Sequence, residues 1–197
     1  MNIPVIRSAT EAERQGVLDV ITLAFATDPV ARWAQPNPTK YFSEFRVWAD
    51  ALGGGGIAHG ATLVANGLEG AAMWLPPGVD PDVERVAELA AAAFQGQHLA
   101  DVMGLFEQMG VYHPQEPCWY LPLVGVDPIL QGRGFGGLLM RHAARRSDAD
   151  GVAAYLESSN PRNISLYLRH GFEILGTIQV GDSPTVTPML RRPNPAT

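Results

Sequence analysis

The chain has very little cysteine and no long apolar segment. Cys118 is the single cysteine among 197 residues, which excludes an internal disulfide and a metal site built from paired cysteines. It precedes an apolar run, so we expect a small buried side chain. No run approaches the roughly 18 apolar residues of a membrane span. The N-terminus also lacks a basic segment followed by an apolar one. We therefore expect a cytoplasmic protein with no signal peptide, no membrane partner and no metal.

Basic residues are scarce as well. Lys and Arg number 14 against 20 Asp and Glu, which gives a formal net charge of −6. A protein that binds nucleic acid usually carries a basic face, so we expect no nucleic-acid partner. Hydrophobic residues make up 46% of the chain, enough for a sizeable core. The length fits one domain over 1–197.

Apolar spacing and turn residues define the elements expected in the first 113 residues. In chain order they are a strand at 3–7, a helix from the capping-box residues Thr10 and Glu13 to about Asp28, a helix over 41–52, a flexible four-glycine break at 53–56, a hairpin of 61–65 and 70–75 turning at Asn66-Gly67, and two or three short helices over 81–110.

The rest of the chain alternates strands and helices. The expected elements are a buried strand over 118–126, a helix over 136–147 with Leu138, Leu139, His142 and Ala143 inward and Arg141 outward, a strand over 152–156, a short helix after Asn160-Pro161, and a strand pair at 172–180 and 185–190. Pro122 implies an edge or a bulge within its strand. This order predicts a mixed α/β sheet with helices on both faces.

The stretch that reads QGRGFGG combines four glycines with the start of a helix. Glycine lets successive backbone N–H groups turn toward one point and lets a ligand approach closely. The helix N-terminus adds further N–H donors and the positive end of its dipole. A glycine-rich turn without a ligand is the alternative, but it carries a large entropic cost. We predict that the loop binds the phosphates of a nucleotide-bearing cofactor, through Gln131, Gly132, Arg133, Gly134, Phe135, Gly136 and Gly137.

Two familiar phosphate-binding patterns do not explain this loop. The P-loop needs Gly-Lys-Ser/Thr, which is absent. The dinucleotide pattern GxGxxG matches at Gly132, Gly134 and Gly137, with an acid twenty residues later at Glu157. In that fold the first glycine follows its strand directly. Here residues 127–131 intervene, and too little chain remains for a doubly wound domain, so nicotinamide binding is disfavoured.

The order strand, Val126-Asp127-Pro128 and then Gln131-Gly-Arg-Gly-Phe-Gly resembles motif A of the GNAT acetyltransferase superfamily. The later segment YLESSNPRNISLYLRHGFEILG resembles another motif of that superfamily. Over residues 112–192 the chain is similar to the puromycin N-acetyltransferase branch, through EPCWYLPLVGVDPILQGRGFG, YLESSNPRN, LYLRHGF and the PMLR ending.

The resemblance implies a fold and assigns the two substrates to different parts of the chain. The fold is a mixed, mostly antiparallel central sheet with helices on both faces and a splayed parallel strand pair at the cofactor site. It implies that residues 1–113, with a helical insertion at 81–113, form the acceptor side. Residues 114–192 would then bind acetyl-CoA as co-substrate, with the glycine loop on its pyrophosphate.

The resemblance also implies roles for single residues. Backbone N–H groups of the strand at Val124, Gly125 and Val126 would orient the thioester. Gly125 suits a bulge that frees such a donor, and a plain strand glycine is the alternative. Tyr167 would protonate the departing thiolate, although an ordinary half-buried tyrosine is the alternative.

Three further expectations concern the catalytic base, the contact with the pantetheine arm of CoA, and an acyl-enzyme intermediate. Glu157 would remove the amine proton, directly or through water, or else is a solvated carboxylate; the fallback bases are Glu116, His113 and Asp28. Asn163 contacts the pantetheine arm or caps its own helix. No acyl-enzyme on Cys118 is expected.

The acceptor is expected to be a small-molecule amine. Its pocket would be walled by the N-terminal helices and 81–113, with Trp33, Trp74, Phe94, Met103 and Phe106 as candidate lining. Asp28 stands where the puromycin branch carries a tyrosine, so the acceptor is expected to differ from puromycin. A protein or peptide N-acetyltransferase and a CoA-binding sensor without catalysis are the alternatives. The sequence leaves a monomer and a homodimer open.

Overall fold

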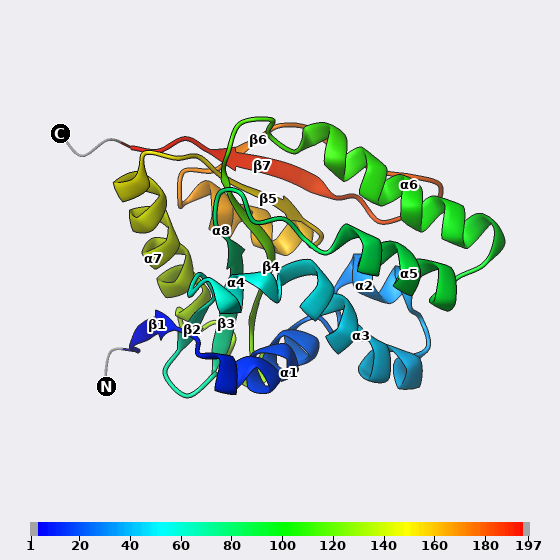
Figure 1. Ribbon diagram of the computed structural model, residues 1–197, viewed down its shortest axis with the longest axis horizontal. Coiled ribbons are helices and arrows are strands. Elements are labelled where there is room, and N and C mark those ends of the chain that lie inside the picture. The colour runs from blue at the N-terminus through cyan, green and yellow to red at the C-terminus, as the bar shows by residue number, and fades with distance from the viewer. Residues whose placement is uncertain (1–3, 195–197) are drawn as a thin grey trace.

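The computed structural model describes residues 4–194 (Figure 1). Part of the predicted first strand, including Ile3, lies outside these residues. The strands are β1 (Ile6–Ser8), β2 (Leu63–Ala65), β3 (Gly70–Leu75), β4 (Trp119–Val126), β5 (Ala154–Ser158), β6 (Glu173–Ile174) and β7 (Thr187–Arg191). The α-helices are α1 (Arg14–Ala24), α2 (Pro29–Ala34), α3 (Pro38–Gly53), α4 (Gly55–Ala58), α5 (Val83–Ala93), α6 (Gly96–Tyr112), α7 (Phe135–Asp150) and α8 (Ile164–Leu168). Three short 3₁₀ turns, η1 (Glu11–Glu13), η2 (Pro128–Leu130) and η3 (Pro161–Asn163), complete the chain.

The strands form one seven-stranded sheet in the order β1-β2-β3-β4-β5-β7-β6. Every neighbouring pair is antiparallel except β4 and β5, which run parallel at the centre. The predicted mixed, mostly antiparallel sheet with one parallel pair is therefore confirmed. The sheet joins the two halves of the chain, because β1–β3 come from the first 113 residues and β4–β7 from the rest.

Helices cover both faces of the sheet, and side chains alternate between two cores as the strand period requires. On β3, Ala72 and Trp74 pack with Leu139 and Met140 of α7, whereas Met73 packs on the opposite face in the cluster of α1 and α3. Figure 1 shows α7 at one end of the molecule and α2, α3, α5 and α6 gathered at the other. No helix within residues 4–194 is both long and apolar enough to cross a membrane.

The parallel pair separates at Pro122. β4 pairs with β5 only from Trp119 to Leu121, whereas its pairing with β3 continues to Val126. The β3–β4 register shifts between Met73 and Leu75, beside Pro122. Proline has no N–H to donate to a neighbouring strand, so the shift falls where a ladder bond is missing. The predicted bulge is confirmed, inside a central strand.

Of the two interpretations of Gly125, the plain strand glycine is confirmed and the bulge is not present. Gly125 stays in register with Ala71 of β3. A Cβ at this position would collide with the side chain of Ala24 on α1. Glycine is required there because α1 lies close against the strand, and not because the backbone bulges.

The glycines at 53–56 form regular structure, contrary to our expectation. α3 continues to Gly53, and Gly55 and Gly56 belong to α4. A Cβ on Gly53 would lie 2.9 Å from Cβ of Met73, and one on Gly56 would meet the carbonyl oxygen of Trp74. These glycines let the helices touch the backbone of β3, and this tertiary packing overrides their low helix propensity.

The hairpin and the two helices of the 81–110 region are confirmed in outline. β2 and β3 pair antiparallel, but four residues connect them, and the positive φ angles fall on Asn66 (45°) and Leu68 (79°). α5 and α6 follow as two helices.

Two expectations about the C-terminal part are wrong. The strand over 172–180 is reduced to β6 and one isolated bridge between Ile178 and Val186, because the chain leaves the sheet there to pack under Leu105 of α6. His142 is exposed. The buried stripe of α7 is instead Leu139, Met140, Ala143 and Ser147, which follows the 3.6-residue period.

A glycine pair tests this account of α4. Gly56→Ala is expected to destabilise the protein by about 1–3 kcal/mol, because the new methyl group meets the backbone of β3. The control is Gly110→Ala on α6, where a Cβ has open space, and which should stabilise by about 0.5–1 kcal/mol. Denaturant unfolding of both variants checks this, and equal stability of the two would contradict it.

Candidate active site

A groove of about 690 Å³ opens where β4 and β5 separate. Its walls are the last residues of β4, the glycine loop, the start of α7, η3 and α8. The predicted cofactor residues that line it are Val124, Gly125, Val126, Gln131, Gly132, Gly134, Phe135, Gly136, Gly137, Asn163 and Tyr167. Arg133 belongs to the same loop, but it is exposed and does not line the groove.

The glycine loop has a geometry suited to an anion. Gly132 and Gly134 have φ angles of +76° and +89°, a left-handed conformation that disfavours a side chain. Gly134 is the N-cap of α7, and the first N–H bonded within the helix is that of Leu138, to the oxygen of Gly134. The N–H groups of the preceding helical residues therefore point out of the helix end, where its dipole is positive. The Gln131 amide fixes the loop to the strand by donating to the Val126 oxygen at 3.2 Å.

Three arginines that sequence reasoning did not assign to the site also line the groove. They are Arg141 of α7, Arg162 of η3 and Arg169 after α8. Arg141, which we had placed outward, follows Gly137 by four residues, so it projects one helical turn beyond the loop. This spacing could have identified Arg141 from the sequence. The positions of Arg162 and Arg169 depend instead on how α8 packs against α7.

Tyr167 lies between the groove and a second, small cavity of about 20 Å³. Its side chain is only 4% exposed and packs edge-on against Phe172, with ring centroids 6.1 Å apart. Burial, and to a lesser extent the Asp28 carboxylate, hold the pKa of Tyr167 above its ordinary value. The phenol is therefore protonated throughout the physiological range.

Asn163 lines the same two cavities as Tyr167. It precedes α8 without making a side-chain capping bond, and Asn160 instead accepts from the Arg162 N–H at 3.1 Å. The interpretation of Asn163 as the cap of its own helix is thus wrong, because the preceding turn η3 takes its cap from Asn160.

Glu157 follows the last paired residue of the parallel ladder, Leu156. It lines the small cavity beside Tyr167 and also a neighbouring apolar pocket. Burial of its carboxyl group raises the pKa of Glu157 to about 7, and the nearby hydroxyls of Tyr120 and Tyr155 oppose the rise without cancelling it. A solvated strand-end carboxylate would not show this shift.

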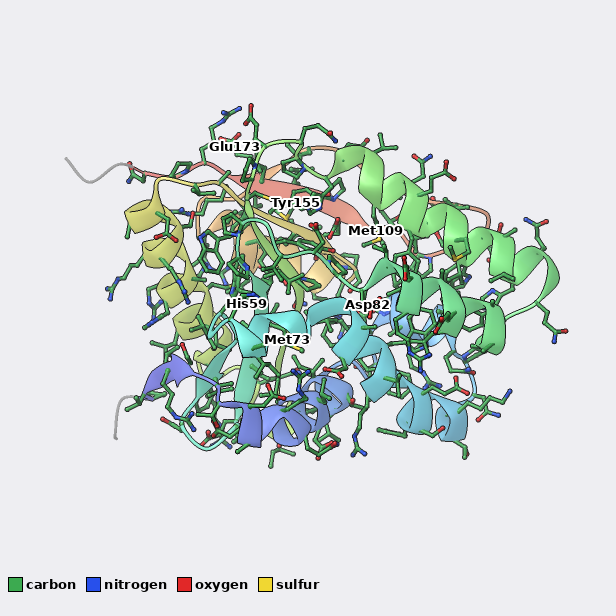
Figure 2. The ribbon with its side chains drawn as sticks, viewed as in Figure 1. His59, Met73, Asp82, Met109, Tyr155 and Glu173 are labelled. Atoms are coloured by element: carbon green, nitrogen blue, oxygen red, sulfur yellow. The ribbon has the colours of Figure 1, made fainter. Side chains whose placement is uncertain are left out.

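The apolar pocket has a volume of about 150 Å³. Its walls come from α2, α3, α6, the residues that follow α1 and α5, and the strands at Pro122 and Glu157. Trp33, Phe94 and Phe106 line it, as predicted. Trp74 and Met103 do not: Trp74 is buried in the core beside α7, and Met103 is 36% exposed on α6. Figure 2 shows another lining residue, Met109, on the side of α6 that faces the rest of the molecule.

Comparison with known proteins identifies the architecture that surrounds these cavities. The model of the acetyltransferase (GNAT) family matches residues 72–172, just over half of the chain, from β3 to the turn after α8. The chain belongs to the GNAT acetyltransferase family. Members of this family use acetyl-CoA as co-substrate.

The curated relatives of this chain match it over a short segment only. The mycothiol acetyltransferase of Mycolicibacterium gilvum is 40% identical over 63 residues, which are 28% of this chain and 21% of the relative. The chain thus spans about a fifth of the length of the curated relatives it matches.

Solved structures match over nearly the whole chain. A Corynebacterium glutamicum protein described as histone acetyltransferase HPA2 and related acetyltransferase has a TM-score of 0.70 at 26% identity, covering 98% of both chains. A Drosophila melanogaster polyamine N-acetyltransferase that forms N-acetylagmatine has a TM-score of 0.68 at 17% identity, covering 96% of this chain and 100% of its own.

Two of the three fallback bases lie outside the cavities, and the third is engaged as a helix cap. Glu116 is exposed, and His113 packs edge-on against Tyr120 and Tyr155 without lining any of the three cavities. Asp28 borders the groove and the apolar pocket, but its carboxylate accepts from the N–H groups at 30 and 31 and, at 2.6 Å, from the hydroxyl of Ser159. Asp28 therefore caps α2 and ties it to the end of β5.

Cys118 has the structural character expected of it. The side chain is 7% exposed, and burial raises the pKa of its thiol to about 11. It lies before the first residue of β4, at the opposite end from the splayed backbone. A protonated thiol in that position is not a nucleophile for the groove.

Proposed function

We propose that this acetyltransferase transfers an acetyl group from acetyl-CoA to a primary amine of a small molecule, by direct attack in a ternary complex. One observation carries the proposal. The small cavity that contains both Glu157 and Tyr167 shares Glu157 with the apolar pocket and Tyr167 with the groove. A base and an acid therefore lie at the meeting point of two sites, one suited to an amine and one to a nucleotide.

The groove fits acetyl-CoA in shape and charge. The helix N-terminus and the left-handed glycines offer N–H donors to a pyrophosphate, and three arginines offer positive charge to further phosphate oxygens. The wall formed by Val124, Gly125 and Val126 runs from this loop to the small cavity, past Asn163. When bound, acetyl-CoA supplies an acetyl group activated as a thioester. The chain's own residues hold it and move the protons.

Glu157 takes the first proton. A pKa near 7 leaves about half of the carboxylates ionised at neutral pH and makes them stronger bases than a solvated glutamate. As the carbon–nitrogen bond forms and the carbon–sulfur bond breaks, Glu157 accepts a proton from the amine and Tyr167 gives its proton to the sulfur. Backbone N–H groups at Val124–Val126, beyond the end of the parallel pairing, stabilise the charge on the acetyl oxygen. Proton exchange with solvent restores both residues.

The walls of the pocket support a small acceptor over a peptide. Phe94, directly after α5, and four residues of α6 (Val102, Leu105, Phe106 and Met109) contribute to its walls, so the 81–113 segment covers the place where an open peptide groove would run. The placement of Glu157 beside Tyr167 favours catalysis over a CoA-binding sensor. A closer relationship to the puromycin branch, and a homodimer, stay predictions.

The first test is release of free thiol from acetyl-CoA across a panel of small amines and peptides. Puromycin, monoamines, diamines, amino sugars and unblocked N-terminal peptides are each supplied with the protein at neutral pH. We expect turnover with small primary amines and none above background with peptides. Acetylation of peptides alone would replace the proposal with the peptide alternative, and binding of acetyl-CoA without any turnover would favour the sensor.

Glu157→Gln tests the base. In the wild type, kcat/KM should rise with pH through an apparent pKa near 7, because only the ionised carboxylate accepts a proton. The amide should lower kcat/KM by about 100-fold or more and remove that limb of the profile. Glu116→Gln, at an exposed carboxylate outside the cavities, is the matched control and should keep both rate and profile. An unchanged limb near pH 7 in Glu157→Gln would refute the assignment.

Tyr167→Phe tests the acid. Removing the hydroxyl should reduce kcat by about 100-fold and leave the dissociation constant of acetyl-CoA unchanged, since the ring still fills its place. Tyr112→Phe on α6 removes a phenol that lines none of the three cavities and should keep full activity. Undiminished turnover in Tyr167→Phe would make Tyr167 a packing residue.

A further inference from the structure

The apolar pocket is lined by aromatic rings to an unusual degree. Seven rings contribute to its walls: Phe25, Trp33, Tyr41, Phe45, Trp48, Phe94 and Phe106. Several of these rings pack against one another. Trp48 and Phe106 lie parallel, with 4° between their planes and 6.3 Å between centroids, and Trp48 also contacts Phe94 at 5.9 Å. Two helices, α3 and α6, and the turn after α5 thus converge on one aromatic wall.

The pocket has two different ends. Glu157 and Ser159 line it together with Phe25 and Pro122, and these same residues line the small cavity beside Tyr167. The other end is formed by Trp33, Trp48, Phe94 and Phe106, which pack into one cluster with Ala90 and Val102. A ligand in the pocket therefore has a reacting, polar end at Glu157 and an apolar, aromatic end between α3 and α6.

The carboxylates around the pocket decide how many positive charges it can receive. Asp28 already accepts three hydrogen bonds, from Val30, Ala31 and Ser159. Glu44 accepts from the Gln35 amide at 2.8 Å. Glu157 is the acid at the reacting end. Two of the three acids that line the pocket, Asp28 and Glu44, thus already accept hydrogen bonds from the protein, so the pocket favours one amino group, at Glu157, over two.

The volume of the pocket sets the size of the ligand. An apolar cavity of about 150 Å³ accommodates one benzene ring, and this pocket measures about 150 Å³. Burying a ring of that size against apolar walls is favourable by roughly 25 cal/mol per Å². Edge-to-face and offset contacts with the surrounding rings add to this.

We propose that the acceptor is a primary amine on a short chain attached to a single aromatic ring, with the amine at Glu157 and the ring against Trp48, Phe94 and Phe106. This rests on the proposed function, because it specifies the acceptor of the same site. Amines with two fused rings, polyamines and amino sugars are disfavoured, the first by volume and the others by the cost of burying a second charge or several hydroxyls in an apolar pocket.

The test compares different amines, each assayed alone under identical conditions. Thiol release is measured with 2-phenylethylamine, tryptamine, putrescine, agmatine and glucosamine. We expect kcat/KM for 2-phenylethylamine to exceed that for each of the others by at least about tenfold. Preference for putrescine, agmatine or glucosamine would overturn the aromatic acceptor and leave the N-acetyltransferase proposal standing. Absence of turnover with every amine, while acetyl-CoA binds, would overturn both.

Phe106→Ala identifies the wall that limits ring size. Removing this ring should enlarge the aromatic end, so the tryptamine to 2-phenylethylamine ratio of kcat/KM should rise by about tenfold or more. Met103→Ala is the matched control, on the same helix but outside the pocket lining, and should leave the ratio unchanged. Phe106→Leu, which keeps more of the packing volume, should shift the ratio in the same direction by less. An unchanged ratio in folded Phe106→Ala and Phe106→Leu, or equal shifts in Met103→Ala, would overturn the ring placement.

Discussion

The separation of β4 from β5 at Pro122 is the constraint on which the other features of this molecule depend. The two strands are parallel and pair for three residues, from Trp119 to Leu121. Beyond that point β4 follows β3 and β5 follows β7. The groove, the small cavity and the mouth of the apolar pocket all open in the gap. Glu157 is the next residue of β5, so its carboxyl group enters the gap at the place where the strand loses its parallel partner.

Helices line the gap on both sides and determine which groups a ligand would meet there. α7 and α8 line one side with glycine N–H groups and arginines, whereas α2, α3, α6 and Phe94 line the other side with aromatic rings. The hydrogen bond that the Ser159 hydroxyl donates to Asp28 connects the two sides, because it fixes the start of α2 to the end of β5. The shielded environment that results raises the pKa of Glu157 to about 7 and keeps Tyr167 protonated. The same closure thus provides both binding and proton transfer in the proposed mechanism.

Local patterns predicted much of this arrangement. The glycine loop, the strand before it and the short helix after Asn160 were located correctly, because each depends on residues adjacent in the chain. The mistakes have a common cause. The helix through Gly55 and Gly56, the glycine at 125 and the shortened strand at 173 are each decided by contact with a distant element, namely β3, α1 and α6. Arg162 and Arg169 were missed for the same reason.

The sequence by itself determined the family, the mixed sheet and the glycine loop before α7, since these follow from short-range backbone chemistry and hydrophobic period. Only the tertiary structure decided that Trp33, Phe94 and Phe106 face one pocket while Trp74 and Met103 do not, and that the carboxyl group of Glu157 is shielded. A side chain's surroundings depend on which remote segments pack around it, and a pKa shift depends on those surroundings and not on neighbours in sequence. The proposed choice of acceptor therefore depends on how α3, α6 and the turn after α5 converge.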